Sequence, residues 1–319
     1  MTKHWRRWKH PVQITFFLLS LLFLAWMIAG QWQALRAYEW HLRAGWLALA
    51  GATLALSWLL EVAVWRRLLG IVGGRLHYGA AWRIWFLSAI TRYIPGNIWQ
   101  PLSMTMLARE QNVRAMATIA SIVIYQMVNL MAAGLIAAAY FPLTGNLGLL
   151  THLLPAAAAR WMALLALPML IFLLRPMWLV QIMNWLLQKM GRDPLPLRLT
   201  TCELLLALLL TTGVWLLLGC SFFFLTLSLS AAPPASLLSL AVHLIAAYPL
   251  SYAAGYISFL TPSGLGVREG VAYLLLAPLI GGATVTIAAL AMRLWLVLGE
   301  LAGAGAGLLL NRPSPRNRE

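Results

Sequence analysis

The sequence is poor in charge, and in negative charge above all. Only 10% of its 319 residues are charged, and 8 Asp and Glu stand against 23 Lys and Arg. A water-soluble protein of this length needs a polar surface that so few charges do not supply, and 62% of the residues are hydrophobic. Apolar runs long enough to cross a bilayer recur along the chain. The composition therefore predicts an all-α polytopic membrane protein.

Signatures of enzymes and metal sites are missing as well. The two cysteines, Cys202 and Cys220, have no metal-ligand spacing, and the sequence contains no GxxxxGKS/T or GxSxG motif. The excess of positive charge is explained by cytoplasmic loops rather than by nucleic acid. We therefore expect no enzyme, no catalytic residue, no metal, no cofactor and no nucleic-acid partner.

Six apolar runs predict full membrane spans, and two further apolar regions are broken in the middle. The spans are 12–30, 45–65, 115–140, about 153–174, 204–229 and 284–310, and the broken regions are 79–108 and 236–280. The first run follows a basic start, as in a signal peptide, but it is long and no small-residue cleavage site closes it, so we expect a retained helix. Residues 175–190 favour a helix along the cytoplasmic interface, or a continuation of the preceding span.

The distribution of Lys and Arg predicts the orientation. They are concentrated in 1–10, 66–83, 109–114, 175–198 and 311–319, and they are missing from 141–159 and 230–242. Basic loops face the cytoplasm, so both termini are expected there. Alternation then makes 79–108 enter and return from the cytoplasm and 236–280 from the outside. The two broken regions are thus predicted to be re-entrant hairpins of opposite sense, in backbone buried by protein or lining a wet cavity.

The domain organisation follows from this order. We expect a single transmembrane domain over 1–319 that contains two repeats of inverted topology. Its parts are a first helix and connection (1–44), a first repeat (45–140) with hairpin 79–108, a connecting span and interfacial helix (141–203), a second repeat (204–310) with hairpin 236–280, and a cytoplasmic tail (311–319). Two unrelated loops are the alternative, because "YIPGN" and "LTPSG" share little sequence.

The first broken region contains "TRYIPGNIWQP" at 91–101. Pro95 and Gly96 interrupt a helix there, and Asn97 is placed to cap the next helix with Gln100 three residues later. A helix that starts inside the membrane presents free N–H groups and a positive dipole end, which attract an anion.

The second broken region contains "TPSGLGVREG" at 261–270. Pro262, Gly264 and Gly266 interrupt the helix, and Gly266 with Glu269 repeats the capping pattern.

Arginines lie beside both predicted helix starts. Arg92 and Arg268 each cost roughly 2.5–3.5 kcal/mol in the bilayer on insertion scales, so each should pair with a group or touch water. A lipid phosphate would satisfy both through bidentate bonds. In the alternative, Arg268 pairs with a protein carboxylate and Arg92 reaches the cytoplasm.

Further polar residues indicate a lined cavity. In span 115–140, Tyr125 and Asn129 lie on one helical face with Thr118 and Ser121, and this face should not point at lipid. Tyr248, Tyr252 and Tyr256 are spaced by four, which we interpret as packing, and Gly299, Gly303 and Gly307 have the spacing of close helix contacts.

Three charged groups complete the list. Arg293 and Glu300 lie on one side of the last span, and either Glu300 or Glu269 would serve as the partner of Arg293. Whether Arg268, Glu269 and Arg293 bind substrate or form a structural ion network is open. Glu61 and Glu300 are candidates for a coupling role.

The motifs "RYIPGNIWQ" (92–100) and "TPSGLGVREG" (261–270) together resemble those of the lysylphosphatidylglycerol synthetase/flippase transmembrane-domain family, which includes the flippase half of multiple-peptide-resistance-type proteins. The likeness covers roughly 12–310. Matching positions are Arg92, Tyr93, Pro95, Gly96, Pro262, Gly264, Gly266 and Glu269, while Ser263 stands where the family usually has glycine. We expect a stand-alone member without the aminoacyl-transferase domain, in the bacterial inner membrane.

The resemblance implies a flippase that moves a phosphate-bearing glyco- or amino-lipid between leaflets. The expected substrate-binding residues are Arg92, Tyr93, Pro95, Gly96, Asn97, Tyr125, Asn129, Gly264, Gly266, Arg268, Glu269 and Arg293. The expected partner is a membrane phospholipid or a polyprenyl-phosphate-type lipid, and a homo-oligomer and a separate lipid-modifying enzyme are left open. The alternatives are a small organic-anion or amino-acid transporter, for which a sealed aqueous vestibule would speak, and a non-transporting accessory membrane subunit with dry packing.

Overall fold

The computed structural model describes residues 29, 32–37, 41–93, 98–145, 175–189, 199–230, 234–257 and 266–310. Within these ranges every regular element is a helix, which confirms the all-α prediction. The predicted span 153–174, and 12–30 except for residue 29, lie outside the described residues.

Four long helices form the body of the protein. They are α3 (Ala44–Ile71), α6 (Ala115–Thr144), α10 (Thr201–Leu229) and α14 (Gly282–Leu310). Each has 28 to 30 residues, or about 42–45 Å at 1.5 Å per residue, and each is apolar enough to cross a bilayer. They confirm the four predicted spans that fall on described residues, and the protein is a multi-pass membrane protein.

Short helices fill the two broken regions. The first holds α4 (Tyr78–Ala89), the 3-10 turn η1 (Ile90–Tyr93) and α5 (Trp99–Glu110); the second holds α11 (Pro234–Leu238), α12 (Ala241–Ile257) and α13 (Val267–Ile280). Two further helices are α2 (Trp32–Ala37) and α9 (Pro176–Lys189). In both regions one helix ends and another begins near the middle, so neither region is a single continuous helix, as predicted.

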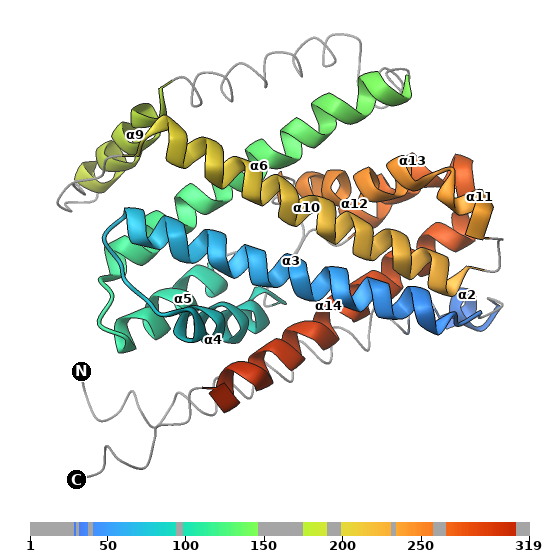
Figure 1. The fold of residues 1–319 in the computed structure, drawn as a ribbon, viewed down its shortest axis with the longest axis horizontal. Coiled ribbons are helices and arrows are strands. Elements are labelled where there is room, and N and C mark those ends of the chain that lie inside the picture. The colour runs from blue at the N-terminus through green and yellow to red at the C-terminus, as the bar shows by residue number, and fades with distance from the viewer. Residues whose placement is uncertain are drawn as a thin grey trace.

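The two groups of short helices lie at opposite ends of the long ones (Figure 1). Helices α4 and α5 pack together where α3 ends and α6 begins, whereas α12 and α13 pack together where α10 ends and α14 begins. Helix α14 packs against both α4 and α13, and α3 packs along α10. Helix α6 likewise packs against α5 and α12, so two long helices, α6 and α14, contact both broken regions.

The lengths of the short helices bear on whether these regions are re-entrant. Helices α4 and α5 have 12 residues each and α13 has 14, which corresponds to about 18–21 Å. That is less than the hydrocarbon core of about 30 Å. Re-entrance from opposite faces stays a prediction, and the shortness and the opposite placement of the two pairs support it.

Close packing of α14 depends on glycine. A Cβ atom at Gly299 would lie 2.1 Å from the Trp58 ring, and one at Gly303 would lie 2.5 Å from the Phe86 ring. The two rings meet edge to face at 5.3 Å, and the Trp82 indole donates a hydrogen bond to the Gly303 carbonyl at 2.9 Å. The predicted packing role of these glycines is confirmed, and it seats α14 against α3 and α4.

A pair of alanine substitutions on α14 tests this packing. Gly299→Ala should destabilise the protein by about 1–3 kcal/mol, because the new methyl group overlaps Trp58. Gly305→Ala is the matched control, since a Cβ there meets no atom within 4 Å and alanine favours a helix. Thermal unfolding in detergent measures both. Equal midpoints for the two variants would contradict the account.

Candidate functional site

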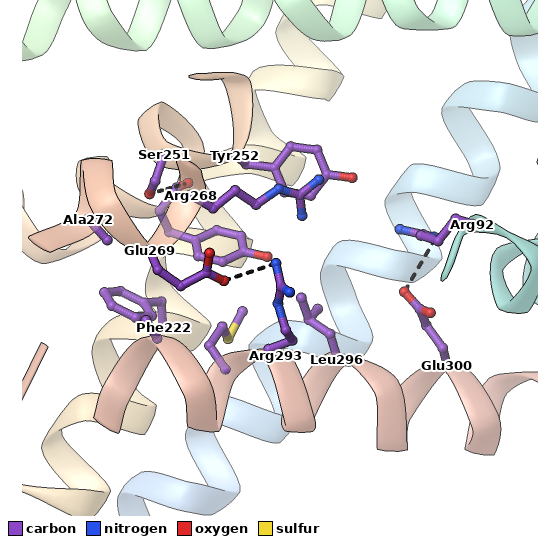
Figure 2. A pocket seen from close by; sticks show the side chains of 13 residues that line it. Arg92, Phe222, Ser251, Tyr252, Arg268, Glu269, Ala272, Arg293, Leu296 and Glu300 are labelled. Atoms are coloured by element: carbon purple, nitrogen blue, oxygen red, sulfur yellow. Dashed lines mark hydrogen bonds and ion pairs between the residues drawn. The ribbon is translucent and has the colours of Figure 1, made fainter. Parts of the chain in front are cut away.

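A small cavity lies where η1, α12, α13 and α14 meet. Its volume is about 60 Å³, and its charged lining residues are Arg92, Arg268, Glu269, Arg293 and Glu300 (Figure 2). These residues come from segments about 200 positions apart in the sequence, and the fold brings them into one apolar surrounding. The structure thus brings charged residues of both motifs next to charged residues of the last span.

Two ion pairs cross this cavity. Arg293 lies 2.9 Å from Glu269, and Arg92 lies 3.3 Å from Glu300 (Figure 2). In each pair one side chain is nearly buried: Glu300 is 4% exposed and Arg293 is 11% exposed. Each of these two charges therefore needs its own partner, Arg92 or Glu269. Of the two predicted candidates, Glu269 is thus the partner of Arg293, and Glu300 pairs with Arg92. Arg92 therefore contacts a protein carboxylate, which differs from both the predicted lipid phosphate and the alternative of reaching the cytoplasm.

Glu269 also fixes the start of α13. Its Oε2 accepts a hydrogen bond of 2.8 Å from the backbone N–H of Gly266. Gly266 has a φ of +77°, a conformation that other residues rarely adopt. The predicted cap formed by these two residues is confirmed. Because the cap uses one of the free N–H groups at this helix end, fewer donors remain there for an anion than the sequence suggested.

The predicted cap of α5 falls on Asn97, which lies outside the described residues, so it stays a prediction. The helix begins at Trp99, and Ile98 before it has a helical conformation and no side-chain hydrogen bond. Pro101 therefore stands in the first turn, where its missing N–H costs no backbone bond.

Arg268 differs from the other two arginines. It has no ion-pair partner among the residues that the structure describes, and its Nε is buried without a hydrogen-bond partner. Its guanidinium carbon lies 3.6 Å from the centre of the Tyr252 ring, a cation–π contact (Figure 2). A Cβ at Gly255 would come within 2.4 Å of the Arg268 side chain, so glycine is needed for this path.

A larger cavity adjoins the first. Its volume is about 400 Å³, and Arg92, Tyr252 and Arg268 line both cavities. Its walls come from α3, α4, α5, α6 and α12, and its aromatic residues are Trp65, Trp85, Tyr125, Tyr252 and Tyr256. Arg268 therefore lies between an ion-paired cavity and an aromatic one.

One edge of the larger cavity is formed by apolar side chains of α6. Ile119, Val123 and Leu130 line it, and these three side chains are 36–40% exposed. We call this edge the apolar rim of the cavity.

Other predicted residues have different outcomes. Tyr125 donates a hydrogen bond of 2.8 Å to Glu61 and lines the larger cavity, and Thr118 and Ser121 are buried, so this polar face points inward as expected. Asn129 is not among the described residues that line either cavity; its carbonyl accepts a bond from the Trp215 indole, and its binding role stays a prediction.

Five predicted binding positions are not described at the site. Pro95, Gly96, Asn97 and Gly264 lie outside the described residues, as does the side chain of Tyr93. Their roles stay predictions.

Sequence reasoning missed part of the lining. Tyr252 and Tyr256 are predicted to be packing residues, but both line the larger cavity. The signal available in the sequence was that Tyr248, Tyr252 and Tyr256 lie four residues apart, just before the predicted helix break. No such signal pointed to Trp85, because a tryptophan in an apolar helix is usually a core residue. Gln126, adjacent to the predicted polar face of span 115–140, lines the cavity as that face predicts.

Comparison with known proteins supplies the family. A search of curated proteins gave no match. The sequence matches the family described as "Lysylphosphatidylglycerol synthase TM region" over residues 13–302, most of the 319-residue chain. The match includes both broken regions and every charged residue of the small cavity. The chain therefore belongs to the lysylphosphatidylglycerol synthase transmembrane-region family.

Proposed function

We propose that the protein is a lipid flippase that moves a phosphate-bearing glyco- or amino-lipid between the leaflets of the bacterial inner membrane. The observation that carries the proposal is Arg268, a cation in an apolar surrounding whose neighbours Arg92 and Arg293 already have carboxylate partners. An unpaired charge at such a place is costly. A lipid phosphate that binds there removes the cost and uses the bidentate geometry of the guanidinium.

The charge of the small cavity fits a singly charged phosphate. Three arginines and two glutamates among its described lining residues leave one positive charge, and the two ion pairs assign that charge to Arg268. A phosphodiester carries one negative charge. One lipid head group therefore neutralises the site without breaking either pair.

The apolar rim of the larger cavity supports a lipid over a water-soluble solute. A lipid must keep its acyl chains in the bilayer while its head group enters the protein. The exposed side chains of Ile119, Val123 and Leu130 provide such a lateral path. A transporter for a small organic anion or amino acid needs a vestibule closed to lipid, and an accessory subunit needs no cavity, so both alternatives are less well supported.

The proposed mechanism is translocation without chemistry. Arg268 binds the phosphate, and the two ion pairs hold α13 and η1 against α14 on either side of it. Rocking of the two repeats then changes which leaflet the site faces. Glu61, held by Tyr125, and Glu300, held by Arg92, are the acidic groups available for coupling. No catalytic residue or cofactor takes part.

The proposed orientation has both termini in the cytoplasm. Exposed arginines gather at the end of the bundle where α3 ends and α6 begins, including Arg67, Arg75, Arg109 and Arg114. Basic residues at one end favour the cytoplasmic side.

The first experiment removes the charge at the centre of the proposal. Arg268→Gln should lower lipid translocation in reconstituted vesicles by about tenfold or more, because a hydrogen bond to a charged group contributes about 1.5–3 kcal/mol. Arg67→Gln, at an exposed position at the end of α3, is the control and should leave the rate unchanged. Unchanged translocation by a folded Arg268→Gln protein would mean that this guanidinium is structural.

A second variant moves the charge without removing it. Gly255→Ala places a methyl group against the Arg268 side chain and should displace the guanidinium from Tyr252. We expect translocation to fall with the protein still folded. Gly270→Ala in α13, where a Cβ meets no atom within 4 Å, is the matched control. A Gly255→Ala protein with full activity would show that the position of Arg268 is unimportant.

Cysteine labelling tests the orientation. Cys202 is exposed at the start of α10, which we place on the cytoplasmic side. In a Cys220→Ser background, a membrane-impermeant maleimide should label Cys202 in inverted membrane vesicles and not in intact spheroplasts. Labelling in spheroplasts would reverse the proposed topology.

A further inference from the structure

The larger cavity has positive charge and no described negative charge. Its charged lining residues are Arg92 and Arg268, and no Asp or Glu lines it within the described ranges. The Glu61 carboxylate accepts the hydroxyl of Tyr125 and is not a lining group. A head group that carries an ammonium would enter without a carboxylate to pair with.

The same cavity has a hydrogen-bonding group in need of a partner. Gln126 lines it from α6, and its Oε1 is buried without a hydrogen bond. Gln100 lines it from α5. A hydroxyl group both donates and accepts, so it can serve either end of an amide. A buried amide oxygen without a partner, beside an open volume, therefore suits a ligand that carries hydroxyl groups.

Aromatic rings form the remaining wall. Trp85 contacts Trp65 with ring centres 5.6 Å apart and meets Tyr125 edge to face at 5.3 Å. These three rings are 0–5% exposed and pack against one another, so they back the wall with apolar surface. Aromatic faces attract cations, but Arg268 already covers Tyr252 at 3.6 Å and would repel a second positive charge.

Building on the proposed function, we propose that the larger cavity binds an uncharged, hydroxylated head group, a glycerol or a sugar, while Arg268 binds the adjoining phosphodiester. The cavity discriminates against head groups that carry an ammonium. Its volume of about 400 Å³ falls within the range of small-molecule pockets, about 300–1,000 Å³. This narrows the cargo from a glyco- or amino-lipid to a hydroxylated one.

Four dioleoyl lipids that differ only in the head group test the inference. They are phosphatidylglycerol, phosphatidylinositol, phosphatidylethanol and phosphatidylethanolamine, and binding to the full-length protein is measured by native mass spectrometry. Phosphatidylglycerol and phosphatidylinositol should bind about fivefold more tightly than phosphatidylethanol, which has the same charge and no head-group hydroxyl, and phosphatidylethanolamine should bind most weakly. Tighter binding of phosphatidylinositol than of phosphatidylglycerol would indicate a sugar-like ring as the head group. Tighter binding of phosphatidylglycerol would indicate a glycerol.

Two results would overturn the inference. They are equal binding of phosphatidylglycerol and phosphatidylethanol, and binding of phosphatidylethanolamine at least as tight as that of phosphatidylglycerol. In either case the proposed function stands as long as Arg268→Gln weakens every lipid. If none of the four lipids binds better to the native protein than to Arg268→Gln, the proposed function fails and the inference fails with it.

A variant of Gln126 assigns the effect to the cavity. Gln126→Leu should lower the affinity for phosphatidylglycerol to that for phosphatidylethanol and leave the latter unchanged, since only the hydroxylated head group uses the amide. Gln181→Leu, on the exposed face of α9, is the control and should change neither affinity. An equal loss for both lipids, or no loss for either, would contradict the assignment.

Discussion

Charge balance inside an apolar surrounding is the constraint on which this structure depends. A charged side chain away from water must be paired or neutralised, and the chain places three arginines and two glutamates around one small cavity. Two pairs form, and Arg268 is left against the face of Tyr252. In the proposed function, this remaining charge is the one that binds the phosphate of a lipid.

The helices that surround the site explain how this arrangement is held. Helix α14 carries Arg293 and Glu300 and therefore contributes to both pairs, one to α13 and one to η1. Its glycine face lets it approach α4 closely and leaves room for the Trp58 ring of α3, as Gly303 faces the ring of Phe86 and Gly299 that of Trp58. Movement of either broken region relative to α14 must strain or break an ion pair. The pairs thus connect the site to the elements that a transport cycle would move.

Much of the architecture could be predicted from the sequence, because apolar length and the position of proline and glycine are local signals. The spans at α3, α6, α10 and α14 and the cap at Gly266 followed from such signals. The ion pairs between charged side chains could not be predicted in the same way. Which glutamate meets Arg92 depends on how η1 packs against α14, and the cavity role of Tyr252 depends on the path of Arg268 across Gly255. These are contacts between distant segments, for which spacing along the chain carries no information.

The most direct test of the central claim is the structure of the protein determined by cryo-electron microscopy in nanodiscs that contain phosphatidylglycerol. The account predicts a lipid phosphate within hydrogen-bond distance of the Arg268 guanidinium, with the Arg92–Glu300 and Arg293–Glu269 pairs intact and the acyl chains leaving past α6. A guanidinium of Arg268 bonded to a protein carboxylate, with no lipid beside it, would contradict the account.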